Sequence, residues 1–194
     1  VKIKVTNLKQ KGEFHGMEVS LELFHNDFDR YPESRRVDGG SDYTCGAQHL
    51  AEAMEGRDER GFHPKSKWHP GLEPTGVDAL YTDDTLKKRM PAYFELKHTG
   101  LYGLGQLWDP SDVSSEGLYT NINNPVPVLT DVFVRNRPYD TTTIDGKVGL
   151  PVLYFRAEPT QRFRVDETKQ LVTNPASSDY ESWIYNFDDN IDLL

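Results

Sequence analysis

The sequence contains a single cysteine and no long apolar run. Because Cys45 is alone, no disulfide can form within the chain, a weak indication of a reducing compartment. A membrane-spanning helix needs about 20 consecutive apolar residues, and the sequence has no such stretch. From these residues alone, the chain is expected to fold as a soluble domain.

Basic side chains are also scarce. The 22 Lys and Arg residues are outnumbered by 31 Asp and Glu residues, which gives a net charge of −9. Nucleic-acid binding needs clustered cations to neutralise phosphates, so a nucleic-acid partner is excluded. The one basic concentration is Lys2, Lys4, Lys9 and Lys11. Such lysines either coat the solvated face of a helix or lie close to anionic lipid headgroups.

Recognised catalytic motifs are absent too. The sequence has no Gly-x-Ser-x-Gly elbow, no glycine-rich phosphate loop and no cysteine–histidine pairing motif. Among its six histidines no pair stands at a recognised zinc-ligand spacing beyond His63 and His69 in a proline-rich loop, and Cys45 is isolated, so zinc is not expected. We therefore expect a protein that is not an enzyme. Because carboxylates are abundant, a carboxylate-based hydrolase remains a distant alternative.

The strongest pattern present is a helical one near the start of the chain. Six apolar side chains recur at separations of three and four residues, which places them on one face of an α-helix: Phe14, Met17, Leu21, Phe24, Phe28 and Tyr31. Extended backwards, the same face passes through polar residues to Ile3. Proline disfavours helical geometry in the residue before it, so the helix is predicted to end at Tyr31-Pro32. Glycines at positions 12 and 16 are expected to permit local melting or the close approach of another helix.

The remaining elements indicate an α+β protein. Residues 44–57 predict a second helix, capped by Thr44 or Asp42 and stopped by Gly56. One or two further helical turns are predicted at 83–90, and strands at 92–96, 126–135, 150–157 and 183–187. The expected fold is one domain, with a long helix on an antiparallel sheet of about four strands. Its parts are the helix at 1–32, a helix- and loop-rich connection at 33–125, and the sheet with its tail at 126–194.

Four segments carry a resemblance to a known family. They are Phe24 to Pro32 (FHNDFDRYP), Gly46 to Asp58 followed by Gly61-Phe62-His63-Pro64, Pro151 to Ala157 (PVLYFRA), and Ile184 to Asn190 (IYNFDDN). In this order they resemble type IV pilin-like proteins and the pseudopilins of type II secretion systems, the major pseudopilin among them. The chain departs from that family in lacking a prepilin peptidase site followed by an apolar run of about 20 residues. Val1 would then lie in the lower half of the first helix.

The resemblance implies a structural role. It predicts a pilin-like ectodomain that serves as a subunit of a pseudopilus or type IV pilus-like filament, for protein secretion or surface attachment. The implied partners are further copies, other pilin-like subunits and the inner membrane, reached through an absent N-terminal segment. The implied place is the bacterial cell envelope, in the periplasm or at the cell surface. The candidate packing and assembly residues are Ile3, Phe14, Met17, Leu21, Phe24, Phe28 and Tyr31.

The C-terminus suggests a metal site. Oxygen-bearing side chains alternate at Asn186, Asp188, Asn190 and Asp192, and Ca²⁺ prefers carboxylate and carboxamide oxygens. Major pseudopilins as a group have a calcium site near the C-terminus, so the resemblance favours calcium at Asp188, Asn190 and Asp192. A solvated acidic tail is the alternative.

Aromatic residues gather in the middle of the chain, at Trp68, Tyr81, Tyr93, Tyr102, Trp108 and Tyr119. Under long loops such residues usually form small secondary cores. If they were exposed, they would instead form the surface of a soluble binding module for a glycan or a protein. That module is the alternative to the filament subunit.

Overall fold

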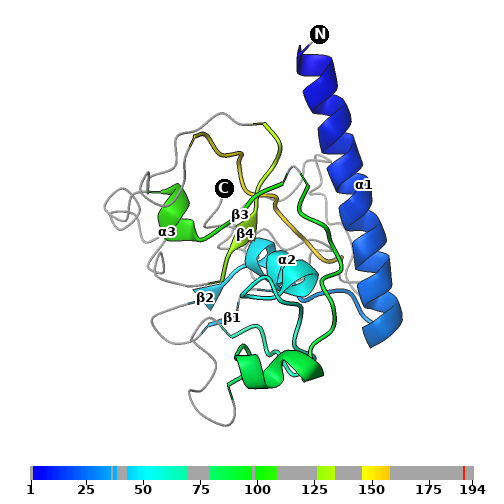
Figure 1. Ribbon diagram of the computed structural model, residues 1–194, viewed down its shortest axis with the longest axis vertical. Coiled ribbons are helices and arrows are strands. Elements are labelled where there is room, and N and C mark those ends of the chain that lie inside the picture. Colours follow the sequence, from blue (N-terminus) through cyan, green and yellow to red (C-terminus); the bar gives the residue numbers. More distant parts are fainter. Residues whose placement is uncertain are drawn as a thin grey trace, which may run out of the picture.

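A computed structural model describes residues 2–35, 37–38, 43–69, 79–97, 99–108, 126–133, 146–157 and 190. It confirms a mixed fold that opens on a long helix and contains small antiparallel sheets. The helices are α1 (Lys2–Phe28), α2 (Gly46–Glu55), the 3-10 helix η1 (Asp83–Lys88) and α3 (Leu104–Leu107). The strands are β1 (Val37–Asp38), β2 (Tyr43–Thr44), β3 (Leu101–Tyr102) and β4 (Val128–Leu129). Figure 1 shows α1 along one side of the molecule, with its N-terminal end projecting beyond the remainder.

Helix α1 ends at Phe28, three residues before the predicted stop at Tyr31. Asp29 adopts a left-handed conformation, with φ 54°, and its N–H donates to the His25 carbonyl at 2.7 Å. Aspartate tolerates this conformation better than most residues and can therefore close a helix. Tyr31 lies beyond the end, where its hydroxyl donates to Glu22 Oε1 at 2.7 Å.

The second helix was predicted correctly apart from its N-cap. Cys45, in an extended conformation, precedes α2, and its N–H donates to Gln48 Oε1 at 3.2 Å. Asp42 lies outside the described residues, and the hydroxyl of Thr44 contacts Trp68 and His49 instead. Gly56 ends the helix as expected, with φ 78° and its N–H bonded to the Glu52 carbonyl. Every residue of α2 is buried, so this helix is the centre of the fold.

An aromatic core joins α1 to α2 and the loop that follows α2. The Phe24 ring is fully buried and lies 4.6 to 6.5 Å, centroid to centroid, from four other rings, those of Phe28, Phe62, Trp68 and Tyr93. Most of these pairs are tilted or edge-on, which is the geometry that aromatic quadrupoles favour. The apolar face predicted for the first helix therefore reaches a core of other aromatic residues.

The single sheet of about four strands is not found among the described residues. They contain two separate two-stranded antiparallel sheets, β1 with β2 and β3 with β4. In the second sheet Leu101 pairs with Leu129, and Tyr102 with Val128. Helix α1 packs on α2, and α2 packs on β4 (Figure 1). The second helix thus packs against both α1 and β4.

The strand predicted at 92–96 is wrong. The Tyr93 N–H donates to the Met54 carbonyl at the end of α2, and the Tyr93 carbonyl accepts the Ser20 hydroxyl of α1. With both backbone groups of this residue bonded to helices, the segment cannot form a ladder with a strand there.

The other predicted strands are shorter than expected. Within 126–135 only β4 forms, because Asp131 Oδ1 accepts the N–H groups of Phe133 and Leu150 and so turns the chain. Within 150–157 there is one isolated bridge, Thr130 with Pro151, and beyond it the Tyr154 carbonyl bonds to the Asn190 side chain. Residues 134–135 and the strand predicted at 183–187 lie outside the described residues.

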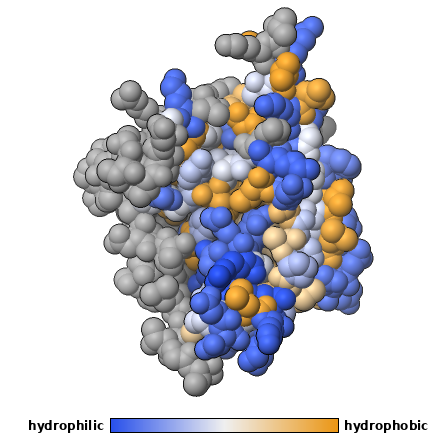
Figure 2. Space-filling model, viewed as in Figure 1, coloured by the Kyte–Doolittle hydropathy of each residue, from blue (hydrophilic) through white to orange (hydrophobic). Residues whose placement is uncertain are grey.

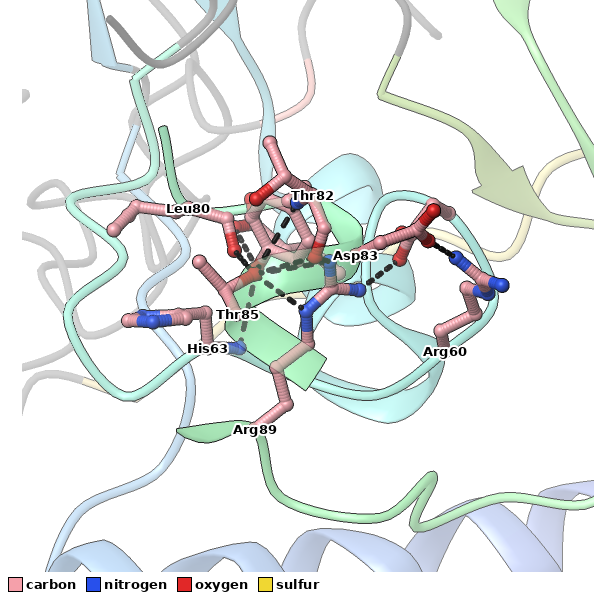
Figure 3. A network of polar contacts seen from close by, with 10 residues as sticks. Arg60, His63, Leu80, Thr82, Asp83, Thr85 and Arg89 are labelled. Atoms are coloured by element: carbon pink, nitrogen blue, oxygen red, sulfur yellow. Dashed lines mark hydrogen bonds and ion pairs between the residues drawn. The ribbon is translucent and has the colours of Figure 1, made fainter. Parts of the chain in front are cut away.

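The 3-10 helix η1 confirms the helical turns predicted at 83–90 and is held by a polar network (Figure 3). The Thr85 hydroxyl lies 2.7 Å from the Leu80 carbonyl and 2.8 Å from that of Thr82. Arg89 donates to Thr85, to the Thr82 carbonyl and to Asp58, with only 1% of its side chain exposed. Its guanidinium also lies 5.0 Å from the centre of the Tyr81 ring. The network ties η1 to the loop after α2.

Candidate assembly surface on the first helix

The buried face of α1 is partly polar. Each of its buried polar side chains bonds to the part of the domain that follows α1, which is called the head below. Gln10 Oε1 accepts the Val132 N–H at 2.8 Å, and Glu13 Oε2 accepts the Thr99 hydroxyl at 3.2 Å. The Ser20 hydroxyl donates to the Tyr93 carbonyl at 2.6 Å. Buried hydrogen bonds are directional, so they fix the rotation of α1 about its axis more tightly than apolar packing would alone.

A second apolar stripe runs along the outward side of α1. It consists of Val5, Leu8, Gly12, Val19 and Leu23, and its four side chains larger than glycine are 46 to 72% exposed. With 100° between successive residues, this stripe lies roughly 120° around the helix from the buried face. Hydrophobic residues are visible among hydrophilic ones on the edge of the molecule that α1 occupies (Figure 2). The sequence pattern does not single out this stripe, because the aromatic period of the buried face is the stronger signal.

Some of the predicted packing residues are buried in the core, and others are exposed to solvent. Met17 and Phe24 are buried, with 5% and 0% exposed, while Leu21 and Phe28 are partly buried against the same core. Ile3 and Phe14, by contrast, are 76% and 50% exposed. Tyr31 is 36% exposed and follows the helix. The predicted face is therefore a core face in its C-terminal half and a solvent-facing one in its N-terminal half.

The two glycines of α1 have different surroundings. A Cβ at Gly16 would lie 3.1 Å from the Phe94 ring, so this glycine lets Phe94 pack against the helix. A Cβ at Gly12 would meet nothing within 4 Å. Only Gly12, within the outward stripe, leaves room for another molecule to approach.

Of the predicted calcium ligands, only Asn190 belongs to the described residues. It is fully buried, its Oδ1 accepts the Ala47 N–H at 2.7 Å, and its Nδ2 donates to the Tyr154 carbonyl at 2.6 Å. Asp188 and Asp192 lie outside the described residues. Where the chain is described, no group of three or more His, Cys, Asp or Glu side chains could hold a metal ion. The calcium site therefore stays a prediction, and the contacts of Asn190 are structural.

The mid-chain aromatics mostly face the interior. Trp68 belongs to the main core, and Tyr93 packs against it. Tyr102 and Trp108 pack against a smaller cluster around Leu104. Tyr81 is half-buried, and its hydroxyl donates to Glu52. Tyr119 lies outside the described residues. These side chains form core and satellite core rather than an aromatic surface.

Three titratable side chains are buried in α2. Burial lowers the pKa of His49 to about 3, and its ring bonds to the Glu33 carbonyl and the Thr44 hydroxyl. Glu52 accepts the hydroxyls of Ser66 and Tyr81 and pairs with the Arg57 guanidinium at 3.1 Å.

Glu55 differs, because its Oε1 is buried without a hydrogen-bond partner. Burial, together with the Glu59 carboxylate, raises its pKa to about 7. A carboxyl group that stays protonated near pH 7 can act as a general acid in an enzyme. Among the described residues the carboxylate that acts on Glu55 is that of Glu59, in the loop directly after α2, and no cleft between the two is found there, so the hydrolase alternative gains no support from this group.

No protein-family model, curated protein or solved structure was found to match this chain. Among the described helices, none combines the length and apolar character needed to cross a membrane. The case for any function therefore depends on the geometry of α1 and of the surfaces beside it.

Proposed function

We propose that this chain is a structural subunit of a pilin-like helical filament, a pseudopilus or type IV pilus-like fibre, assembled through α1. The observation that carries the proposal is the outward stripe of Val5, Leu8, Gly12, Val19 and Leu23. Its large side chains stay about half exposed or more, although the buried face of the same helix is bonded to the head. The apolar side chains of the stripe form two exposed pairs, Val5 with Leu8 and Val19 with Leu23, separated by Gly12 and the polar His15. Exposed apolar patches of this kind mark interaction sites.

The shape of the helix supports the same proposal. A helix of 27 residues is about 40 Å long, far longer than the ten residues of α2 that it packs on. Its N-terminal part, with Ile3 and Leu8 more than 70% exposed, projects from the head (Figure 1). In a filament with heterologous contacts, one surface of each subunit binds a different surface of the next. A projecting helix with its own apolar stripe supplies one such surface.

The proposal also includes the membrane anchor, the cellular location and the pilin-like form of the head. We propose that the full protein carries a membrane segment before α1 and resides in the bacterial cell envelope, and that the sheets complete a pilin-like head. The resemblance of Phe24 to Pro32 and of the later segments to pilin-like proteins supports this placement. The soluble binding module and the carboxylate hydrolase stay as alternative predictions.

The test is a charge placed in the stripe of the full-length protein, expressed in its own cells. Leu8→Glu and Leu23→Glu are expected to abolish filaments, seen by electron microscopy of sheared material, while subunit abundance on immunoblots stays normal. Asn7→Glu is the matched control, because Asn7 is exposed on α1 outside the stripe. Its filaments should persist. If both stripe variants assemble as well as the control does, the stripe is not an assembly surface.

A further inference from the structure

An open pocket of about 580 Å³ lies between the end of α1 and the segment that follows Pro151. It is distinct from the outward stripe and is formed by residues far apart in the sequence. The side chains that give it chemical character are His25, Arg30, Tyr31, Tyr154, Phe155 and Arg156. A volume of this order suits a small ligand.

The polar character of the pocket is cationic. Two guanidinium groups and an imidazole line it, and no carboxylate does, although the chain as a whole carries a net charge of −9. Arg30 is exposed and has no ion pair or hydrogen bond with another described residue. Arg156 lies 3.4 Å from Glu33, whose other oxygen accepts the N–H groups of Ser34 and Arg35. The Glu33 charge is therefore shared, and the pocket keeps an excess of positive charge.

The apolar walls of the pocket are aromatic rings in fixed positions. The Tyr31 ring lies 4.6 Å from the His25 ring, and its hydroxyl is held by Glu22. The Tyr154 hydroxyl donates to the Pro32 carbonyl at 3.1 Å. With both hydroxyls bonded, the two tyrosines are anchored at their polar ends. Rings that are already ordered lose little entropy when a flat ligand packs on them.

We propose that this pocket binds a carboxylated sugar unit of an acidic polysaccharide. The C–H-bearing face of a sugar ring packs on tyrosine and phenylalanine, while a carboxylate matches the planar donor fork of arginine. Neither feature alone requires this ligand. A bare inorganic anion would leave the aromatic walls without a partner, and a neutral sugar would leave Arg30 without an anionic partner. Only a ligand with both parts uses the whole pocket.

The inference is independent of filament assembly, because the pocket and the outward stripe share no residue. It also moves the glycan-binding alternative to the end of α1, away from the mid-chain aromatics, because those among the described residues mostly pack into the core. The double arginine variant, Arg30→Gln/Arg156→Gln, is therefore expected to assemble normally, and an assembly-deficient stripe variant to bind normally.

The experiment is a titration of this chain with digalacturonic acid at low salt, followed by calorimetry and by NMR shifts. Saturable binding is expected, with at least a tenfold loss of affinity in Arg30→Gln/Arg156→Gln and in Tyr31→Ala. Lys87→Gln, an exposed cation on η1 outside the pocket, is the matched control and should bind as the parent does. Urea unfolding of each variant separates lost binding from lost folding.

Three outcomes would overturn the proposal. The first is equal binding by maltose, which has the rings without the carboxylates. The second is stronger binding by a short poly-glutamate of equal charge, which would assign the pocket to acidic peptides. The third is binding that the double arginine variant retains while it stays folded.

Discussion

Asn190 caps the first turn of α2 from a position 143 residues further along the chain, through its bond to the Ala47 N–H. The first N–H groups of a helix have no partner within the helix, and a carboxamide oxygen satisfies one of them here. The same side chain bonds to the Tyr154 carbonyl, so a single residue joins the central helix to the segment after Pro151.

Replacing Asn190 by alanine should destabilise the protein by about 3 kcal/mol, because a buried N–H and a buried C=O each lose a partner. Urea unfolding at neutral pH measures the change. In Asn190→Asp the acceptor for Ala47 remains, but an ionised carboxylate then faces the Tyr154 carbonyl. The difference in unfolding free energy between Asn190→Asp and the parent should become smaller at a pH low enough to protonate the new carboxyl group. Parent-like stability of Asn190→Ala would show that these two bonds contribute nothing.

Gly46 and Gly12 offer a matched pair of substitutions. A Cβ at Gly46 would lie 2.3 Å from the Tyr154 carbonyl oxygen and 3.1 Å from that of Ser34, and neither backbone group can retreat easily. Gly46→Ala is expected to cost about 1 to 3 kcal/mol of stability. Gly12→Ala should instead add about 1 kcal/mol, because alanine is the better helix former and the space is open. Thermal unfolding that moves both variants in the same direction would contradict this explanation.

The Arg89 guanidinium is buried and bonded on three sides, so Arg89→Gln should be among the most damaging changes in the connection. The expected loss is about 3 kcal/mol, since the variant leaves the Asp58 carboxylate and the Thr82 carbonyl without their charged partner. Arg60→Gln is the control, because Arg60 pairs with Asp83 while 52% of its side chain is exposed. Its loss should stay below about 1 kcal/mol. Equal losses in chemical denaturation would indicate that burial of Arg89 has no energetic consequence.

The sequence was a good guide wherever a signal was local. The 3.6-residue period located α1 and α2. Gly56 marked the end of α2, because glycine adopts a positive φ at little steric cost and this preference depends on no residue distant in the sequence. The predicted end of α1 was three residues too late. Pro32 disfavours helical geometry only in the residue before it, whereas the left-handed conformation of Asp29 ends the helix earlier.

Partners distant in sequence could not be predicted. Residues 92–96 have the composition of a strand, but the backbone of Tyr93 is bonded to two helices. The polar residues Gln10 and Ser20 carry no apolar signal in the sequence, yet they are buried and bonded to the head. The contacts of Asn190 depend on a residue 143 positions away. No periodicity or composition contains that information.

Two of the three buried titratable groups of α2, His49 and Glu55, predict an unusual pH profile. The pKa of His49 is lowered to about 3, so between its ordinary value of 6.5 and about pH 3 the unfolded chain binds a proton that the folded one does not. The His49 contribution to stability is therefore complete above pH 6.5 and is lost as the pH falls. The pKa of Glu55 is raised from 4.5 to about 7, so the folded chain binds the extra proton between those values. Its effect is opposite, because stability is lost as the pH rises.

Between pH 4.5 and 6.5 the two slopes, each about 1.4 kcal/mol per pH unit, should nearly cancel. Glu55→Gln removes one of them, so the variant is expected to be more stable than the parent at pH 7 and to lose stability steeply as the pH falls from 6.5 to 4.5. Urea unfolding at four pH values measures both slopes. Glu18→Gln, an exposed carboxylate on α1, should reproduce the parent profile. If Glu55→Gln also does so, the burial of Glu55 does not perturb its protonation, and the balance with His49 does not exist.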